Sequence, residues 1–245
     1  MTEVALITGA GIGIGRAAAL AFARAGYHVV VTDVLEAEGN AVVAEITATG
    51  GTAEFHRLDV RSTEMADAVV ADVEARHGKI DVIVANAGIA HKVPLAEMSD
   101  EKWDYTFDID LKGIFRIVRP ALPGMKARGK GAIVALSSIM GVAYGWDEHV
   151  HYSAAKAGII GMTKSLAREV SGQGVRVNAV APGPINTPLV RNLSAEWQRV
   201  KAAELPLGRF GEPEEVAETV AFLCSPAAAL FVGQTLGPNS GDVML

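Results

Sequence analysis

The sequence predicts an α/β fold in which one doubly wound parallel sheet of about seven strands carries helices on both faces. Short β-rich runs alternate with helical patterns along the 245 residues, the order that produces a parallel sheet. Runs such as VALIT and DVIVA are apolar throughout, as expected for strands covered on both faces. A glycine-rich turn joins the first such run to the first helical pattern.

The expected elements follow one another at a steady pace. Strands are expected at residues 4–8, 28–32, 53–57, 80–85, 132–136, 175–180 and 235–236. Helices are expected at residues 16–25, 37–49, 65–77, 101–125, 153–170 and 213–223. No internal repeat and no Ser/Gly-rich or Pro-rich linker interrupts this order, so a single domain over residues 1–245 is expected.

Composition argues against several classes of partner and location. The formal net charge is -6 and no cluster of Lys or Arg is present, so neither nucleic acid nor a membrane surface is expected as a partner. No apolar run reaches the roughly 18 residues of a membrane span. The first expected strand begins almost at the first residue, which leaves no room for a signal peptide. Cys224, the only cysteine, follows Phe222 and Leu223 and is expected to be a small buried residue. A cytoplasmic location is expected.

The first turn, TGAGIGIG at residues 8–15, is expected to bind the pyrophosphate of a dinucleotide. Glycine permits backbone angles closed to other residues and lets a phosphate approach the main chain without meeting a Cβ. The following helix directs its free amides and positive dipole end at the same place. The spacing is T-G-x-x-x-G-x-G rather than G-x-G-x-x-G. Alone it is weak evidence, because any corner between a strand and a helix can use glycine.

The second expected strand ends at Asp33. This position is within the roughly 20-residue reach at which a carboxylate accepts hydrogen bonds from the adenosine ribose. A 2′-phosphate would instead need a nearby cation, and the flanking candidates Ile12 and Val34 are apolar. An aspartate at a strand end can also serve only as a helix cap. We expect the cofactor to be NAD rather than NADP.

A tyrosine and a lysine stand four residues apart in HYSAAKAG, so Tyr152 and Lys156 lie on one face of the expected helix. A phenol with a pKa near 10 keeps its proton at neutral pH, and a neighbouring ammonium favours the phenolate. Such a tyrosine can exchange a proton with an alcohol or carbonyl oxygen. Ser138, at the end of the preceding strand, could hold that oxygen. Alone, this Tyr/Lys spacing is common among solvated helix neighbours; the serine and the dinucleotide turn favour catalysis.

The sequence resembles the short-chain dehydrogenase/reductase superfamily over essentially its whole length. The motifs that carry the resemblance are TGAGIGIG at 8–15, Asp59 in LDV, NAGI at 86–89, Ser138 in LSS, YSAAK at 152–156, VNAVAPGPINTP at 177–188, and the later GRFGEPEEVA and VGQTL. The resemblance implies a Rossmann-type fold and a homotetramer. It implies that Tyr152 is the catalytic acid/base, that Lys156 lowers its pKa and binds the nicotinamide ribose, and that Ser138 orients the substrate oxygen.

The turn, the Asp33 argument and the resemblance together predict the cofactor contacts. The resemblance places residues 59–60 by the adenine and 182–187 beside the nicotinamide. The predicted cofactor-binding residues are Gly9, Gly11, Ile12, Gly13, Ile14, Asp33, Asp59, Val60, Asn86, Ala87, Gly88, Tyr152, Lys156, Pro182, Gly183, Ile185 and Thr187.

One residue near the predicted catalytic group departs from the family pattern. Where the family usually has Asn, the motif IDLKG carries Asp110. In the family this position helps a water chain link the lysine to solvent, partly through a main-chain carbonyl that Asp retains. A buried Asp110 could be ionised and strengthen the field on Lys156, or protonated and act as a donor. The sequence leaves both states open, and Asp110 is included among the catalytic candidates.

Substrate specificity is expected in segments that the common motifs do not fix. A substrate lid is expected at about residues 184–206. The aromatic residues before the catalytic tyrosine favour an apolar or cyclic alcohol. The six histidines lack H-x-x-x-H or a similar ligand spacing, so no metal is expected. The predicted substrate contacts, each of which could equally be an exposed loop residue or one packed locally, are His91, Tyr144, Trp146, His149 and Trp197.

The function expected from these features is NAD-dependent interconversion of a small-molecule secondary alcohol and a ketone. Hydride would pass between the substrate carbon and nicotinamide while Tyr152 transfers the proton of the oxygen. One alternative is a 3-oxoacyl thioester reductase acting on acyl carrier protein or CoA. Such reductases share the motifs but mostly use NADP, so Asp33 counts against this alternative. An alternative of another class is a dinucleotide-binding regulatory protein without turnover, supported by Asp110 alone.

Overall fold

The computed structural model describes residues 2–244, and within them the strands form one seven-stranded parallel sheet in the order β3-β2-β1-β4-β5-β6-β7. The doubly wound sheet predicted from the sequence is therefore confirmed. The order reverses between β1 and β4, the kind of switch point at which such sheets bind ligands. The strands are β1 (Val4–Thr8), β2 (His28–Asp33), β3 (Thr52–Arg57), β4 (Val82–Ala85), β5 (Gly131–Leu136), β6 (Val175–Val180) and β7 (Thr235–Leu236).

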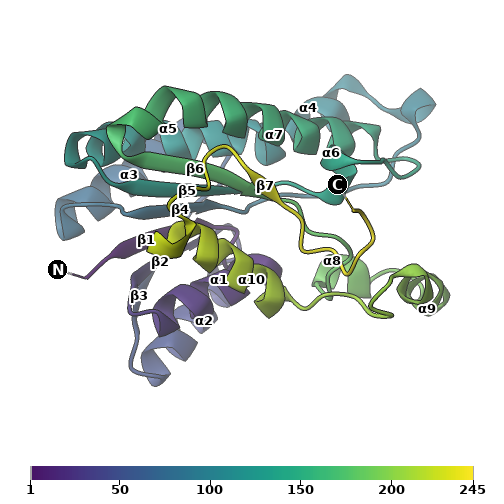
Figure 1. Ribbon diagram of the computed structural model, residues 1–245, viewed down its shortest axis with the longest axis horizontal. Coiled ribbons are helices and arrows are strands. Elements are labelled where there is room, and N and C mark those ends of the chain that lie inside the picture. Colours follow the sequence, from purple (N-terminus) through teal and green to yellow (C-terminus); the bar gives the residue numbers. More distant parts are fainter. Residues whose placement is uncertain (1, 245) are drawn as a thin grey trace.

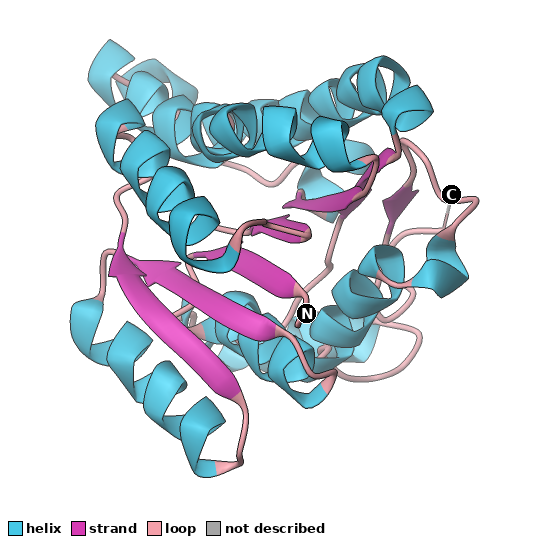
Figure 2. Ribbon diagram, turned by 90° about the vertical axis from the view of Figure 1, so that its left-hand side faces the viewer, coloured by secondary structure: helices cyan, strands magenta, loops and turns pink. Residues whose placement is uncertain are grey.

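Helices cover both faces of the sheet (Figures 1 and 2). One layer holds α1 (Gly13–Arg24), α2 (Glu36–Ala48) and α10 (Pro213–Cys224). The other holds α3 (Thr63–His77), α4 (Asp100–Asp110), α5 (Lys112–Arg128), α6 (Ile139–Val142) and α7 (Val150–Val170). Short helices α8 (Pro188–Arg191) and α9 (Ala195–Glu204) lie beyond the carboxyl ends of the strands. Three 3-10 turns complete the described elements: η1 (Leu95–Glu97), η2 (Ser171–Gln173) and η3 (Pro226–Ala228).

The continuous apolar character of the strands follows from this layering. All five residues of β1 are buried. Successive side chains of a strand point to opposite faces, so Leu6 packs in the layer with α3 and α5 while Ile7 packs in the layer with α1 and α10. Cys224 is buried as expected, and burial raises the pKa of its thiol to about 12. Among the described residues, no helix combines the length and the apolar character that crossing a membrane requires.

The observed helices differ from the expected ones most clearly at the break between α4 and α5, while α1 and α7 each begin three residues early. The helix predicted over 101–125 is two helices, because α4 ends at Asp110 and α5 begins at Lys112. Between them, the Leu111 side chain lies beside Gly158 of α7. A Cβ added to this glycine would come within 2.9 Å of Leu111. Both helices bury apolar residues in the same layer, which explains why the apolar pattern does not reveal the break. The first helix begins three residues early, at Gly13, because the glycine-rich turn itself supplies its first turn.

Candidate active site

A cavity of about 590 Å³ lies at the carboxyl ends of β1, β2, β4 and β5, where the sequence predicted the ligand. Its wall brings together segments far apart in the chain. Of the predicted cofactor-binding residues, those that line it are Gly9, Ile12, Gly13, Ile14, Asp33, Asp59, Val60, Asn86, Ala87, Gly88, Tyr152, Lys156, Pro182 and Thr187.

Three predicted cofactor residues lie outside this lining. The amide of Gly11 donates to Asp33 Oδ2 at 2.8 Å, so this glycine braces the carboxylate. Gly183 packs against Asn239, which a Cβ on the glycine would approach within 2.7 Å. Ile185 belongs to the core under α1 and α10. Direct contact of these three residues with the cofactor stays a prediction.

The glycine-rich turn is held in place by the neighbouring strand. Gly9 and Gly13 have φ angles of 63° and 57°, in the left-handed region that favours glycine. The side-chain amide of Asn86 donates to Thr8 O at 3.0 Å and to Gly9 O at 2.9 Å. A Cβ on Gly15 would overlap the Gly9 carbonyl and this amide. Asn86 therefore acts as a brace between the ends of β1 and β4, and Gly15 allows helix α1 to pack against it.

The Asp33 carboxylate is buried and already has two backbone partners. Oδ2 accepts from Gly11 N, and Oδ1 accepts from Leu35 N at 3.0 Å. Each oxygen retains a second lone pair that a ribose hydroxyl can use. Sequence reasoning overlooked Arg57, which is the register partner of Asp33 on β3 and lines the same cavity. The sequence could have indicated Arg57, because it is the last residue of the next expected strand after Asp33.

Of the four predicted catalytic residues, Tyr152 and Lys156 line this cavity, and Ser138 follows Ser137, which also lines it. Tyr152 and Lys156 lie in the first two turns of α7, with Lys156 Nζ 5.4 Å from the centre of the tyrosine ring. The ammonium donates to Leu136 O at 3.0 Å. Ser138 caps the N-terminus of α6, where its Oγ accepts from Met140 N at 3.2 Å, and its hydroxyl acts to lower the pKa of Tyr152. Ser137 ties the end of β5 to α7 by donating from Oγ to Lys156 O at 2.8 Å.

Asp110 lies beside Lys156 and is completely buried. Its Oδ2 is 3.2 Å from Lys156 Nζ, while Oδ1 accepts from Ile89 N at 2.9 Å. The contact with Lys156 is an ion pair without the alignment of a hydrogen bond. Burial raises the pKa of Asp110, and the ammonium opposes this rise. Burial disfavours the charge on Lys156, yet Asp110 and Tyr152 leave the lysine pKa above its usual value. Burial favours the protonated carboxyl and the nearby ammonium favours the ionised one, so the ionised state stays a prediction.

The acidity of Tyr152 is set by opposing effects. Burial is the largest and raises its pKa, and the Asp110 charge raises it further. Lys156 and the Ser138 hydroxyl act in the other direction and lower the same pKa. Lys156 thus acts on Tyr152 in the direction expected from the sequence, but burial outweighs it. At neutral pH the phenol therefore keeps its proton and is suited to donate it to a carbonyl oxygen.

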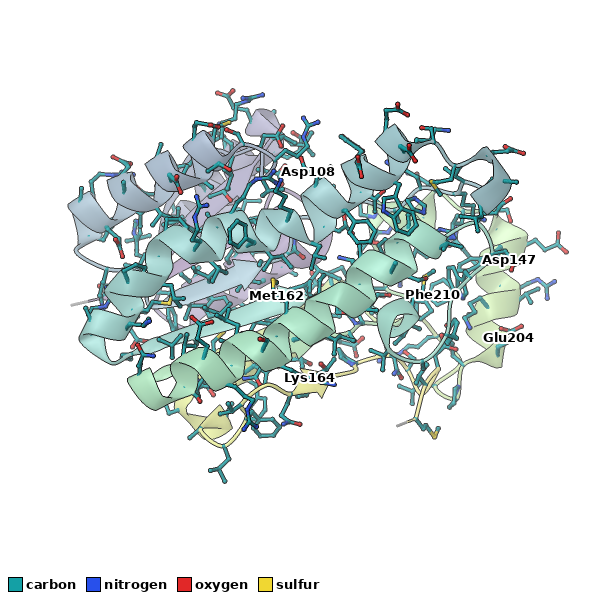
Figure 3. All side chains as sticks on the ribbon, turned by 90° about the horizontal axis from the view of Figure 1, so that it is seen from above. Asp108, Asp147, Met162, Lys164, Glu204 and Phe210 are labelled. Carbon is teal, nitrogen blue, oxygen red and sulfur yellow. The ribbon has the colours of Figure 1, made fainter. Side chains whose placement is uncertain are left out.

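An aromatic chain leads from Tyr152 to helix α9. The centroid of the His149 ring lies 6.3 Å from that of Tyr152, and the centroid of the Trp146 ring lies 6.2 Å from that of His149. Trp146 meets Trp197 of α9 edge to face at 5.2 Å. Phe210, which was not predicted from the sequence, is the next ring, with its centroid 6.0 Å from that of Trp197. Figure 3 shows Phe210 at the same end of the molecule as Asp147 and Glu204. Three predicted substrate residues thus pack on one another beside Tyr152, although none of them is among the residues that line the cavity.

The other two predicted substrate residues lie elsewhere. Tyr144 donates its hydroxyl to Asp242 Oδ2 at 2.7 Å, and Lys201 of α9 binds Oδ1 of the same carboxylate at 2.8 Å. Tyr144 therefore helps to hold α9 against the C-terminal segment. His91 stacks on Tyr105 at 6.5 Å, on the side of the cavity that Tyr105 lines.

Comparisons with known proteins agree with these features. Residues 9–241 match the family described as enoyl-(acyl carrier protein) reductase. The chain is 40% identical over 242 residues to the 3-oxoacyl-[acyl-carrier-protein] reductase FabG of Thermotoga maritima, covering 99% of this chain and 98% of the relative. It is 44% identical over 240 residues to the cis-4-hydroxycyclohexanecarboxylate dehydrogenase of Sinomonas cyclohexanicum, covering 98% and 96%. The crystal structure of gox2181 superposes with a TM-score of 0.94 at 35% identity, covering 98% of this chain and 95% of that one.

The matches extend over nearly the full length of each protein, and most of the predicted cofactor-binding residues meet in one cavity. The chain therefore belongs to the short-chain dehydrogenase/reductase superfamily, as its motifs predict, and is an oxidoreductase acting on CH–OH and keto groups.

Proposed function

We propose that the reaction is the NAD-dependent interconversion of an apolar or cyclic secondary alcohol and its ketone. The observation that carries this proposal is the position of Tyr152 between Lys156 and the aromatic chain of His149, Trp146 and Trp197. A bound nicotinamide would supply or accept the hydride. Ser138 would hold the substrate oxygen, and Tyr152 would give it a proton during reduction or remove one during oxidation.

The residues around the cavity fit a dinucleotide. The glycine-rich turn and the N-terminus of α1 offer backbone amides to a pyrophosphate. Three large apolar side chains, Ile12, Val34 and Leu35, are exposed around the cavity near Asp33, where an adenine ring would cover them. The Asp33 carboxylate would accept from the ribose hydroxyls and repel a 2′-phosphate. These features support NAD, while Arg57 is the nearby cation through which a phosphate could be accommodated.

Replacing Asp33 with Asn is expected to lower kcat/KM for NADH about tenfold, because a charge-assisted hydrogen bond to the ribose becomes a neutral one. The ratio of NADPH to NADH activity should rise at the same time, since the repelling charge is gone. Steady-state kinetics with both cofactors measure this, with Asp67→Asn on the exposed face of α3 as the control. A wild type that prefers NADPH, and loses that preference in Arg57→Ala, would contradict the NAD assignment.

Replacing Asp110 with Asn is expected to move the pH profile of alcohol oxidation to lower pH. Oxidation needs the phenolate of Tyr152, and the Asp110 charge raises the pKa of that phenol. Removing the charge lowers the pKa of Tyr152, so kcat/KM should begin to rise at a lower pH than in the wild type. The measurement is kcat/KM for alcohol oxidation across the alkaline range. A profile that does not move, or moves upward, would contradict a direct action of ionised Asp110 on Tyr152.

The substrate proposal has one serious competitor. Relatives from Thermotoga maritima and Staphylococcus aureus are 3-oxoacyl-[acyl-carrier-protein] reductases, which favours a 3-oxoacyl thioester. The aromatic chain and the Sinomonas relative, which is a dehydrogenase of a ring alcohol, favour a cyclic substrate. Nicotinamide absorbance with cyclohexanol, cis-4-hydroxycyclohexanecarboxylate and acetoacetyl-CoA distinguishes the two. Turnover of the thioester alone would refute the ring-alcohol proposal, and absence of any turnover with NADH bound would favour a regulatory role.

The proposal extends to the lid and the assembly. We propose that residues 184–206, with α8 and α9, close over the substrate in a single-domain chain, because Trp197 reaches the aromatic chain from α9.

The expected homotetramer is supported by an apolar groove between α5 and α7, where Phe115 is 47% exposed. Light scattering should then give four times the 25.6 kDa chain mass. We further propose that the substrate is a small molecule and that the protein acts in the cytoplasm, without a nucleic-acid or membrane partner.

A further inference from the structure

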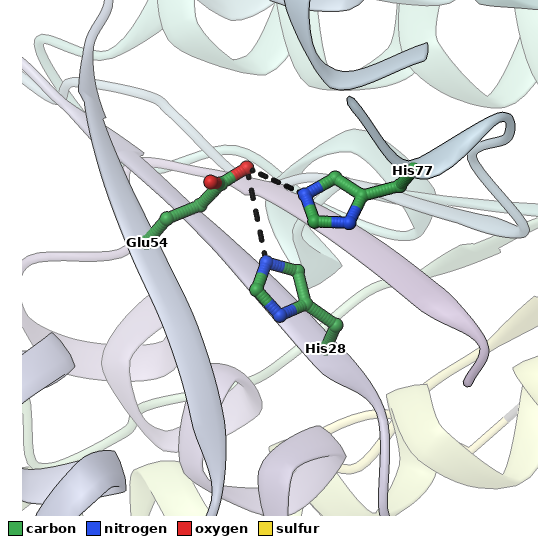
Figure 4. Close-up of side chains that lie close together, drawn as sticks. All are labelled: His28, Glu54 and His77. Carbon is green, nitrogen blue, oxygen red and sulfur yellow. Dashed lines mark hydrogen bonds and ion pairs between the residues drawn. The ribbon is translucent and has the colours of Figure 1, made fainter. Parts of the chain in front are cut away.

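A second polar cluster lies toward the amino-terminal ends of the strands, away from the cavity. His28 begins β2, Glu54 lies in β3 and His77 ends α3, and Figure 4 shows both imidazoles directed at the same carboxylate. His77 Nε2 is 3.2 Å and His28 Nε2 is 3.8 Å from Glu54 Oε1. We propose that His28, Glu54 and His77 bind a divalent transition-metal ion, with Zn²⁺ as the best-suited ion.

The fold explains why these residues meet although they are far apart in the sequence. Glu54 is the register partner of Val30, which packs in the layer with α3. Because side chains alternate along a strand, His28 shares that face with Val30. Helix α3 crosses the same face and ends at His77. The expectation that no metal binds rested on the spacing of histidines in the sequence, and parallel strand register lies outside what such spacing can detect.

The interatomic distances suit a zinc site. Zinc binds histidine nitrogen and carboxylate oxygen at about 2.0–2.2 Å in a tetrahedron, which places neighbouring ligand atoms about 3.3 Å apart. The distances of 3.2 and 3.8 Å to Glu54 Oε1 lie close to this value, and the three ligand atoms are within 4.8 Å of one another. Only small adjustments of two side chains are needed. A water molecule would complete the tetrahedron.

Hydrogen bonding alone does not account for the cluster. His77 is within hydrogen-bond distance of Glu54, but His28 Nε2 is buried and has no hydrogen-bond partner among the described residues. Buried polar atoms are normally satisfied, so a nitrogen in this position calls for a partner. The two imidazole rings lie 4.3 Å apart between centroids and present Nε2 to the same oxygen. A metal ion would accept the Nε2 lone pairs of both His28 and His77.

The surrounding charges orient the carboxylate. Arg76 binds Glu54 Oε2, the oxygen turned away from the two histidines, and so leaves Oε1 for the ion. Such an outer partner of a ligating carboxylate is common at metal sites. Arg76 also pairs with Asp72 at 2.5 Å, and this second carboxylate offsets the cationic charge of the guanidinium. His56 Nε2 also lies 3.4 Å from Glu54 Oε1, but its contact with Arg76 Nη2 at 2.8 Å holds it as an outer residue rather than a fourth ligand.

The site would have a structural role. It would join β2, β3 and α3 at the edge of the sheet, while the reacting groups lie beyond the other ends of the strands. Binding to the folded state alone stabilises that state in proportion to the logarithm of the free ion concentration. We therefore expect Zn²⁺ to raise the midpoint of thermal unfolding. We also expect little change in turnover per folded molecule.

The test is direct metal binding by the full-length protein after treatment with EDTA. At about pH 8, where histidines of ordinary pKa are neutral, Zn²⁺ titrated against a chromophoric chelator should fill one site per chain. Glu54→Gln and His77→Gln should weaken binding by at least about tenfold. Asp67→Asn removes an exposed carboxylate of α3 that pairs with Arg119 and takes no part in the cluster, and it should bind with nearly the wild-type affinity.

A spectroscopic measurement keeps the test independent of variant folding. Co²⁺ bound to the wild-type protein should show the visible absorption of a tetrahedral site with nitrogen and oxygen ligands, and Zn²⁺ should displace it. Failure of the wild type to bind either ion stoichiometrically would overturn the proposal. So would equal affinity in folded Glu54→Gln and His77→Gln variants, with folding checked by circular dichroism.

Discussion

Replacing Tyr152 with phenylalanine is expected to lower kcat about 10²–10⁴-fold, the range typical for loss of a general acid/base. The substitution removes only the hydroxyl that exchanges a proton with the substrate oxygen. The ring keeps its packing against His149 and Lys156, so NADH binding should stay close to the wild-type value. Stopped-flow or steady-state absorbance gives the rate, and the quenching of protein fluorescence gives the affinity for NADH.

The control for this experiment is Tyr27→Phe. Tyr27 packs edge to face on Phe22 of α1 and does not line the cavity. Turnover of this variant should match the wild type. Preserved turnover in Tyr152→Phe would show that another group moves the proton. Loss of NADH binding together with turnover would instead show that the phenol supports the cofactor site.

Gly15→Ala is expected to be the most damaging small substitution in the glycine-rich turn. Its new Cβ would overlap the Gly9 carbonyl carbon and oxygen, which are backbone atoms and cannot rotate away. The Asn86 amide that braces this turn would also have to move. Overpacking of this kind costs about 3 kcal/mol, the upper end of the usual range. We expect a lower midpoint of thermal unfolding and weak NADH binding in whatever protein remains folded.

Gly172→Ala supplies the matched control. Gly172 lies in the 3-10 turn η2, has no neighbouring atom within 4 Å of the added Cβ and does not have a positive φ. Its unfolding midpoint and NADH affinity should therefore stay near those of the wild type. If Gly15→Ala behaved in the same way, the close packing of α1 against the β1 and β4 ends would not be required for the site.

Local patterns in the sequence were sufficient for the architecture. Strands such as 4–8 and 82–85 are apolar except for Thr8 because both of their faces are covered, and this is visible without any long-range information. The glycine-rich turn and the Tyr152/Lys156 pair lie within single segments, so their spacing could be read directly. The break between α4 and α5 was missed because both helices bury apolar residues in the same layer, so the apolar pattern continues across Leu111.

The sequence by itself determined the parallel sheet, and it predicted which end of the sheet binds ligands and which group transfers the proton, because strand periodicity and helical spacing are local properties. Only the tertiary structure decided which charges become neighbours. Asp110 reaches Lys156, and Arg57 comes beside Asp33, through helix packing and strand register. The aromatic chain to Phe210 and the cluster around Glu54 arise in the same way. Their members lie on different elements, and their proximity depends on how those elements are packed, which no short stretch of sequence encodes.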